Sequence, residues 1–174
     1  ALDPAAMAAL AARTRAVATT VGPYARYGGA LAAACAAAGT HYCDLTGEAH
    51  FVHGLIAAHH ETAQNTGAKL VPACGFDSIP SDLGALVAAQ RFAQAHGRPP
   101  ARIDTYVRQL KGGFSGGTVA SQLSISQLSA QPEVRRVWAD PHSLEAGADG
   151  TRNAERDVVP VQFNADLGRW GGTF

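Results

Sequence analysis

The stretch VPACGFDSIPSDLGALVAA, residues 71 to 89, decides the fold of this chain. Its apolar start, with Leu70 before it, has the composition of a short buried strand that ends at Gly75. A polar turn follows, and an Ala- and Leu-rich run then predicts a helix to about His96. The sequence therefore predicts a strand–turn–helix junction, and what that junction holds is the question for function.

The segments upstream repeat the same alternation. Short apolar runs predict strands at 16–20, 41–45 and 69–74, and periodic segments predict helices at 4–14, 28–38 and 48–66. Strands that alternate with helices through short loops are typical of a parallel sheet in an α/β fold. Because ligands bind beyond the carboxyl ends of such strands, we expect a site formed by loops 21–27, 46–48 and 75–82.

Local signals place the ends of the predicted helices. Asp3 and Pro4 form an N-cap followed by proline in the first turn, and Gly39 and Gly67 are typical C-terminal glycines. The helix at 48–66 carries an apolar stripe that is predicted to face the core, made of Phe51, Val52, Leu55 and Ile56.

The character of the chain changes after Arg98-Pro99-Pro100. Residues 102–110 alternate loosely, as in a partly exposed strand, and a glycine-rich turn follows. Thr118 is a predicted N-cap for a Ser-rich helix to about Ala130, and a short helix is expected at 133–138. We therefore expect a domain boundary between residues 98 and 99.

Composition excludes several classes of protein. Of the 174 residues 47% are apolar and 16% charged, as in soluble globular domains. A formal net charge of zero gives no electrostatic footprint for nucleic acid. Membrane association is not indicated, since no run approaches the roughly 20 apolar residues of a membrane-spanning helix.

The cysteines favour a reducing, cytoplasmic environment. Cys35, Cys43 and Cys74 are odd in number, form no CxxC pair and are predicted to be core thiols. The histidines predict no metal site, because His53, His59 and His60 lack metal-binding spacing and a completing carboxylate or thiol. We expect these histidines to be partly buried structural residues.

Two short motifs raise rival functions. No G-x-G-x-x-G occurs, and the P-loop spacing fails because Thr118 and Val119 replace its Lys and Ser/Thr. G-x-S-x-G at 113–117 has the context of a nucleophile elbow and makes Ser115 a candidate hydrolase nucleophile. Its partners are poor, because the only downstream histidine is His142, so a glycine turn is the favoured interpretation.

The junction itself allows two interpretations. In the structural one, Gly75 permits a tight turn and Ser78, Ser81 or Asp82 caps the helix. In the functional one, helix N-terminal amides face a ligand, and Asp77 orients a hydroxyl or amide of it. The loop Val21-Gly22-Pro23-Tyr24 also allows two interpretations. It either only ends a strand, or it lets the backbone approach a ribose or nicotinamide closely.

Three blocks carry a family resemblance. TTVGPYARYGGALAAACAAAGTHYCDLTGE (19–48), GAKLVPACGFDSIPSDLG (67–84) and LKGGFSGGTVASQL (110–123) resemble the saccharopine dehydrogenase-like oxidoreductases. The most similar branch includes the actinobacterial trans-acting enoyl reductases. The resemblance runs from about residue 1 to about residue 145 and weakens the hydrolase interpretation.

The resemblance implies a fragment of an NAD(P)-dependent enzyme that acts in lipid biosynthesis. Residues 1–98 would be the second half of a Rossmann-like parallel sheet with its helices, and 99–174 the start of an α+β substrate domain. The cofactor would be NADP or NAD, the substrate a small molecule or acyl thioester, and a homodimer is left open. The residue that selects NADP or NAD is expected before Ala1, and the edge at 16–20 is expected to be unpaired.

The resemblance also implies site residues. It places Val21, Gly22, Pro23 and Tyr24 along the dinucleotide, and Gly75, Phe76 and Asp77 near the nicotinamide and substrate. Saccharopine-type relatives continue Gly-Leu/Phe-Asp-Pro-Gly, whereas Ser78-Ile79-Pro80 follows here, which argues against an amino-acid substrate.

The sequence does not assign a catalytic acid. Tyr24, Tyr27 and Ser115 have suitable hydroxyl groups, but no pattern fixes where those groups lie. A non-catalytic Rossmann-like binding module is a second alternative to the oxidoreductase.

Overall fold

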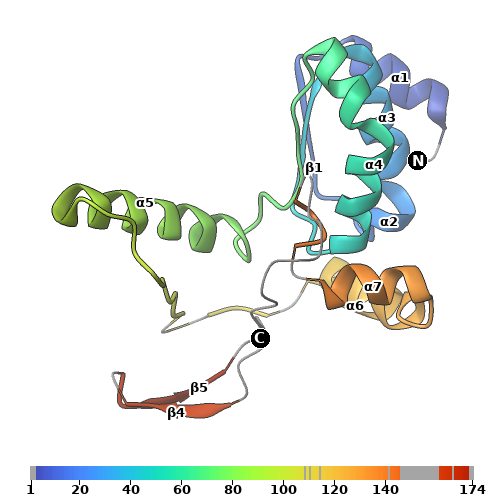
Figure 1. Cartoon of the computed structure of the whole chain (residues 1–174). Coiled ribbons are helices and arrows are strands. Elements are labelled where there is room, and N and C mark those ends of the chain that lie inside the picture. The colour runs from blue at the N-terminus through green and yellow to red at the C-terminus, as the bar shows by residue number, and fades with distance from the viewer. Residues whose placement is uncertain are drawn as a thin grey trace.

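The computed structural model describes residues 3–107, 109, 111–113, 115–140, 142–145, 161–165 and 167–172. Its elements in chain order are α1 (Pro4–Ala12), β1 (Ala16–Thr19), α2 (Tyr24–Tyr27), α3 (Gly29–Ala38), β2 (His41–Asp44), α4 (Ala49–Thr66), β3 (Leu70–Val71), α5 (Ile79–His96), α6 (Gly116–Leu128), α7 (Pro132–Ala139), β4 (Gln162–Asn164) and β5 (Arg169–Gly171) (Figure 1). The chain is an α/β protein.

Three strands form the parallel sheet that the sequence predicts. Their order is β1-β2-β3, with Val17 opposite Tyr42 and Tyr42 opposite Leu70. β3 has only two residues, fewer than the six predicted for the strand at 69–74. β1 lies at one edge of this sheet, and β4 and β5 form a separate antiparallel hairpin.

Helices α1 to α4 lie on one side of the sheet (Figure 1). We call α1–α4 with β1–β3 the layered unit. α3 packs between α1 and α4, and Tyr42 on the covered face of the sheet is 1% exposed. The main core cluster consists of Ala11, Tyr24, Ala32, Cys35, Tyr42, Phe51 and Leu55. Since side chains alternate along a strand, Cys43 and Val71 point to the opposite face.

The predicted helix ends of the layered unit are confirmed. The Asp3 carboxylate accepts a hydrogen bond of 3.0 Å from the Ala5 amide, as an N-cap does. Gly39 and Gly67 end α3 and α4 in the left-handed conformation, with φ of 72° and 76°. The sequence did not predict α2, a single turn directly after Pro23.

Some burial predictions are wrong. Ile56 is 41% exposed, although Phe51, Val52 and Leu55 of the same stripe are buried. The buried face of α4 is therefore narrower than the predicted four-residue stripe. Cys35 is buried as expected, but Cys43 is half-buried and Cys74 is exposed. The open face of the sheet and the loop after β3 lack a covering layer in the described part of the chain.

The second half of the chain differs more from the predictions. The described residues of 102–110 form no strand, and residues 108 and 110 lie outside the described set. α6 begins at Gly116 rather than after Thr118, because Ser115 is the N-cap and its Oγ accepts a hydrogen bond of 3.1 Å from the Thr118 amide.

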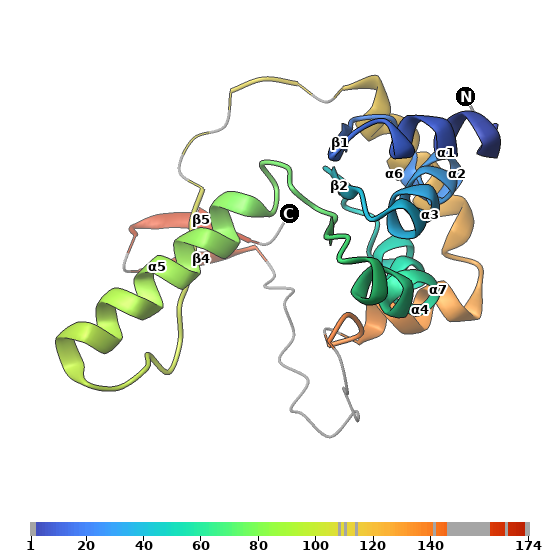
Figure 2. The same ribbon diagram turned by 90° about the horizontal axis from the view of Figure 1, so that it is seen from above.

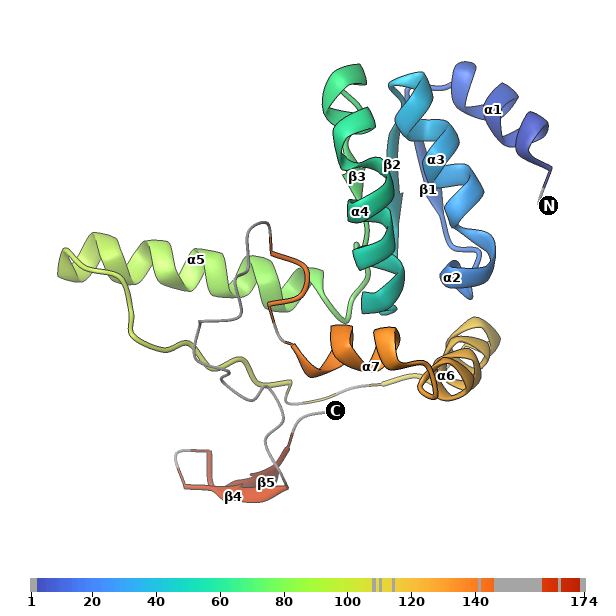
Figure 3. The ribbon, with the colours of Figure 1, turned by 45° about the vertical axis from the view of Figure 1, so that its right-hand side comes forward.

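α5 leaves the layered unit and runs away from it, as Figures 1 and 2 show. α6 and α7 lie beyond the carboxyl ends of the strands, below α2 and α4 (Figure 3), and α7 packs against α4. None of the helices in the described ranges is long and apolar enough to span a membrane. The later helices therefore lie at the carboxyl edge of the sheet: α5 follows the loop after β3, and α6 and α7 lie beyond the strand ends.

Candidate functional site

The carboxyl ends of the three parallel strands form the candidate site. The edge loops, as we name them, are 20–23 after β1, 45–48 after β2 and 72–78 after β3. Because β2 is central, the first and third loops are two strand spacings apart, about 10 Å. All seven residues predicted to bind the cofactor lie in these loops or, for Tyr24, directly after one.

Asp44 fixes the second and third edge loops to each other. The residue is 3% exposed, and its Oδ1 accepts hydrogen bonds from the amides of Thr46 at 3.0 Å and Ala73 at 3.1 Å. Its Oδ2 accepts a bond of 2.6 Å from the Tyr42 hydroxyl. Burial, reinforced by this bond to Asp44, raises the pKa of Tyr42 far above its ordinary value, so the phenol stays protonated.

Glu48 fixes the first edge loop to the second. The residue is 2% exposed, and its two carboxylate oxygens accept hydrogen bonds of 2.8 Å from the amides of Tyr24 and Ala25. These amides belong to the first turn of α2, so Glu48 caps that helix from a distant loop. Oε1 of Glu48 also accepts a bond of 3.0 Å from the Ser121 hydroxyl on α6.

The turn at Gly22 and Pro23 is closely packed. A Cβ on Gly22 would lie 3.3 Å from the Tyr24 ring and 3.5 Å from Ser121 Oγ, so a larger residue would displace its neighbours. Tyr24 is 4% exposed, and its hydroxyl donates to the Thr19 carbonyl at 3.3 Å. Burial raises the pKa of Tyr24 above its ordinary value, and its proton is already engaged, so this phenol is a poor proton donor for a substrate.

The junction after β3 is also tight. A Cβ on Gly75 would lie 3.1 Å from Leu45 Cβ, which explains the glycine by close approach. Of the three predicted caps of α5, Ser78 occupies the N-cap position, but its side chain makes no capping bond. The amides of Ser78 and Ile79 instead donate to the Gly75 carbonyl, at 3.3 and 3.0 Å.

This arrangement leaves fewer amides at the start of α5 for a ligand than the functional interpretation expects. Two of them already have the Gly75 carbonyl as their partner, and Pro80 in the first turn has no amide hydrogen. Phe76 is 61% exposed, and Asp77 is exposed beside it.

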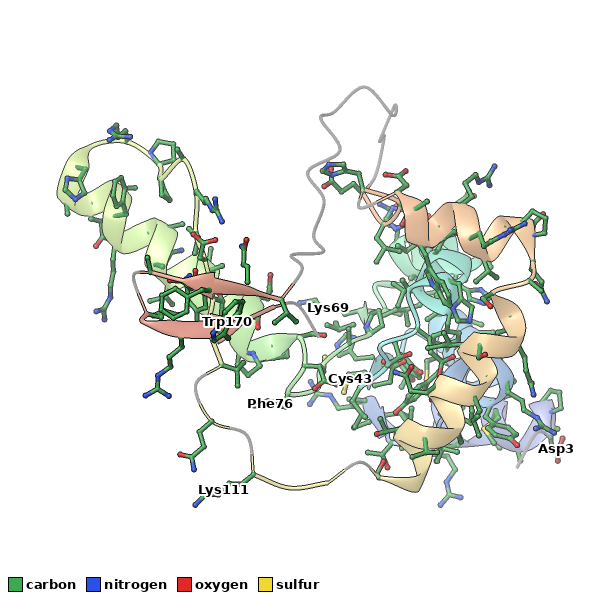
Figure 4. The ribbon with its side chains drawn as sticks, turned by 90° about the horizontal axis from the view of Figure 1, so that it is seen from below. Asp3, Cys43, Lys69, Phe76, Lys111 and Trp170 are labelled. Carbon is green, nitrogen blue, oxygen red and sulfur yellow. The ribbon has the colours of Figure 1, made fainter. Side chains whose placement is uncertain are left out.

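Each edge loop exposes one large apolar side chain. Val21 is 60% exposed in the first loop, Leu45 48% in the second and Phe76 61% in the third. In the view from below, Phe76 lies between the layered unit and α5, and Cys43 is the labelled residue of the layered unit next to it (Figure 4). Exposed apolar groups on neighbouring loops, with an acidic side chain next to one of them, suit a ligand with apolar faces and a polar edge.

The structure brings the predicted residues to one edge but reveals two that the sequence analysis missed. Asp44 and Glu48 lie within the quoted block 19–48, yet no local pattern marks them as the groups that hold the loops. The available signal was an acidic residue at the end of a buried strand and a second one four residues later.

The hydrolase interpretation finds no support here. The Ser115 hydroxyl caps α6 and lies 3.0 Å from Thr118 Oγ1, and no described residue before it forms the strand that a nucleophile elbow needs. His142 is bonded to Glu145, with Nδ1 and Oε1 2.7 Å apart.

The histidines of α4 do not form a cluster of ligands. His53 and His59 are half-buried, whereas His60 is exposed, contrary to the expectation that all three are partly buried. Among the described residues, no group of three or more His, Cys, Asp or Glu side chains is placed to hold a metal ion.

Comparison with known proteins identifies relatives. No family model matches the chain, and no solved structure matches it. A protein of Mycobacterium tuberculosis named as a candidate trans-acting enoyl reductase is 46% identical, over 90% of this chain and 37% of its own length. Proteins named trans-acting enoyl reductase from Mycobacterium bovis and Mycobacterium ulcerans are 41% and 42% identical, over 99% of this chain and 43% of theirs.

The chain thus spans about two fifths of the length of the curated relatives it matches. An identity above 40% along nine tenths or more of the chain is too high for chance similarity. The chain is therefore a homologue of proteins named trans-acting enoyl reductase.

Proposed function

We propose that this chain supplies the nicotinamide side of an NAD(P)-dependent enoyl reductase of the saccharopine dehydrogenase-like type. In this proposal the layered unit is the second half of a Rossmann-like domain, and α6 and α7 begin the substrate domain. The substrate is the carbon–carbon double bond of an enoyl thioester in lipid assembly. The homologous enoyl reductases support the reaction class.

One observation carries the proposal. The edge loops, which the buried carboxylates of Asp44 and Glu48 hold together, expose Val21, Leu45 and Phe76, and Asp77 follows Phe76. In open parallel sheets this edge is where ligands bind. The apolar side chains would contact a nicotinamide ring and exclude water from it, and Asp77 would accept a hydrogen bond from an amide or hydroxyl. The dinucleotide, when bound, supplies a hydride for the reduction.

The fit is limited to one end of the cofactor. The chain contains no G-x-G-x-x-G segment to hold a pyrophosphate. A Cβ on Gly22 or Gly75 would lie within 3.5 Å of a neighbouring protein atom, so both glycines let the edge loops pack closely.

Saturating the double bond also requires a proton at the α-carbon. Of the three hydroxyl groups with suitable chemistry, that of Tyr24 is buried and bonded to a carbonyl, and that of Ser115 caps a helix. Tyr27 is half-buried, with the Arg26 guanidinium 5.2 Å from its ring centre. We assign no catalytic acid among them.

The test is titration of NADPH and NADH into the protein expressed from the complete gene that encodes this chain, followed by calorimetry or Trp fluorescence. We expect saturable binding, and we expect Gly22→Val to weaken it about tenfold because the added side chain overpacks the turn. Gly54→Ala on α4 is the matched control, since nothing lies within 4 Å of its added Cβ.

Consumption of the reduced nucleotide with an enoyl thioester then tests the reaction. A folded protein that binds neither nucleotide contradicts the proposal. Binding without turnover of any enoyl thioester would favour the non-catalytic binding module instead.

A further inference from the structure

The carboxylate of Glu48 joins three segments that are distant in sequence. It lies in the loop after β2, it caps α2, and it accepts a hydrogen bond from Ser121, which is 73 residues away on α6. The carboxylate is almost completely buried, and its partners among the described residues are all hydrogen-bond donors. Hydrogen bonds to a buried carboxylate are among the stronger ones in proteins.

Ser121 also lies near the turn at Gly22. Its Oγ lies 3.5 Å from the position that a Cβ on Gly22 would occupy. The serine hydroxyl therefore lies close to the first edge loop as well as to Glu48. A purely local cap of α2 would need neither contact.

α6 is only partly buried. None of its residues is fully buried: Val119 and Leu123 are 49% and 62% exposed, and Ala120, Ile125 and Leu128 are half-buried. A hydrogen bond from a half-buried serine to a buried carboxylate therefore contributes to fixing this helix to the layered unit.

We propose that Glu48 is a positioning residue that couples the docking of α6 to the turn at Gly22 and Pro23. This inference rests on the proposed function, in which that turn lies along the nicotinamide end of the dinucleotide. One carboxylate oxygen serves both Tyr24 and Ser121, so a turn ordered by nucleotide fixes the acceptor that α6 needs. By linkage, a docked α6 must then strengthen nucleotide binding by the same factor.

Amide hydrogen exchange of α6, with and without NADPH, tests the coupling in the protein expressed from the complete gene. In the wild type we expect slow exchange of the α6 amides that becomes about tenfold slower with NADPH. In Ser121→Ala and Glu48→Gln the amides should exchange about tenfold faster without nucleotide, and the NADPH effect should disappear. Ser126→Ala, exposed on the same helix, is the matched control and should behave as wild type.

Nucleotide affinity provides the second readout. In the wild type, NADPH slows the exchange of the α6 amides by a measured factor. Ser121→Ala should raise the Kd for NADPH by that same factor. If the role of Glu48 were merely structural, its substitution would speed the exchange of the α6 amides, but the change in Kd would not equal the NADPH effect on that exchange. Ser121→Thr, which restores a hydroxyl, should recover part of both effects.

The possible failures are distinct. Unchanged exchange of α6 in Ser121→Ala overturns the inference, whether or not Glu48→Gln folds. Faster exchange with an unaltered Kd also overturns it, while the proposed function stands. A wild type that binds no nucleotide overturns the proposed function and the coupling together, although the exchange data would still show what holds α6.

Discussion

Helices α3 and α5 show how differently this chain treats apolar residues. α3 has ten residues, seven of them Ala, and buries Ala32, Cys35 and Ala36. α5 has eighteen residues and larger apolar side chains, and it buries none. Burial in this molecule is therefore decided by neighbouring elements and not by the composition of a helix.

Small side chains explain the close packing of α3. They let α1 and α4 approach it from two sides, so even short side chains lose their contact with water. On α5, Leu83, Leu86 and Val87 remain 47–51% exposed because no described element covers them. The apolar stripe of α5 alone cannot create a core.

The same substitution in the two regions is the strongest test of this contrast. Leu55→Ala in α4 should lower the free energy of unfolding by about 3 kcal/mol, because the 7% exposed side chain leaves a cavity in the core. Leu86→Ala in α5, which is 51% exposed, should change it by less than about 0.5 kcal/mol. Urea denaturation of the 174-residue chain measures both values.

An equal loss in the two variants would show that α5 packs against an apolar surface in solution. The open face of the sheet would then be the first surface to examine, since Val71 is 47% exposed there.

Glycine substitutions sharpen the contrast with a smaller effect. Gly75→Val should destabilise the chain by about 2 kcal/mol, because the added Cβ would lie 3.1 Å from Leu45 Cβ. Gly84→Ala in α5 should stabilise it by up to about 1 kcal/mol, since nothing lies within 4 Å and alanine favours a helix. Thermal unfolding of both variants under one set of conditions gives the comparison.

A Gly75→Val variant as stable as wild type would remove the close-approach argument for this junction. A Gly84→Ala variant that loses stability would show that a neighbour meets this face of α5.

The layered unit could be predicted from sequence because its signals are local. Asp3, Gly39 and Gly67 mark helix ends through their own backbone preferences, and short apolar runs mark the strands. The carboxyl-edge site followed from the order of elements alone. Strand prediction failed at 102–110 because loose alternation gives no strand without a partner to pair with.

The groups that organise the site could not be predicted, because their roles depend on distant partners. Glu48 acquires its role from amides 23 and 24 residues earlier and a hydroxyl 73 residues later. Asp44 likewise depends on Ala73, which follows 29 residues later. An acidic residue after a strand is usually exposed, and only the folded loops show that these two are buried.

His50 offers the smallest and most selective test, at the boundary between the layered unit and α7. Both of its ring nitrogens are buried without a hydrogen-bond partner among the described residues, and Trp138 of α7 packs edge-on at 5.9 Å. Burial lowers the pKa of His50 from its ordinary value of 6.5, although the nearby Glu48 carboxylate opposes the shift.

The unfolded chain therefore binds a proton at His50 more readily than the folded chain does. The contribution of His50 to stability is fully present above pH 6.5, falls as the pH drops through that value, and levels off below the folded pKa. His50→Leu should remove this part of the loss when unfolding free energy is measured from pH 8 to pH 5, a range of about three units around the ordinary histidine value. His60→Gln, exposed on the same helix, should keep the wild-type profile. If His50→Leu also keeps it, the imidazole is solvated in solution, and α7 is not closed over the start of α4.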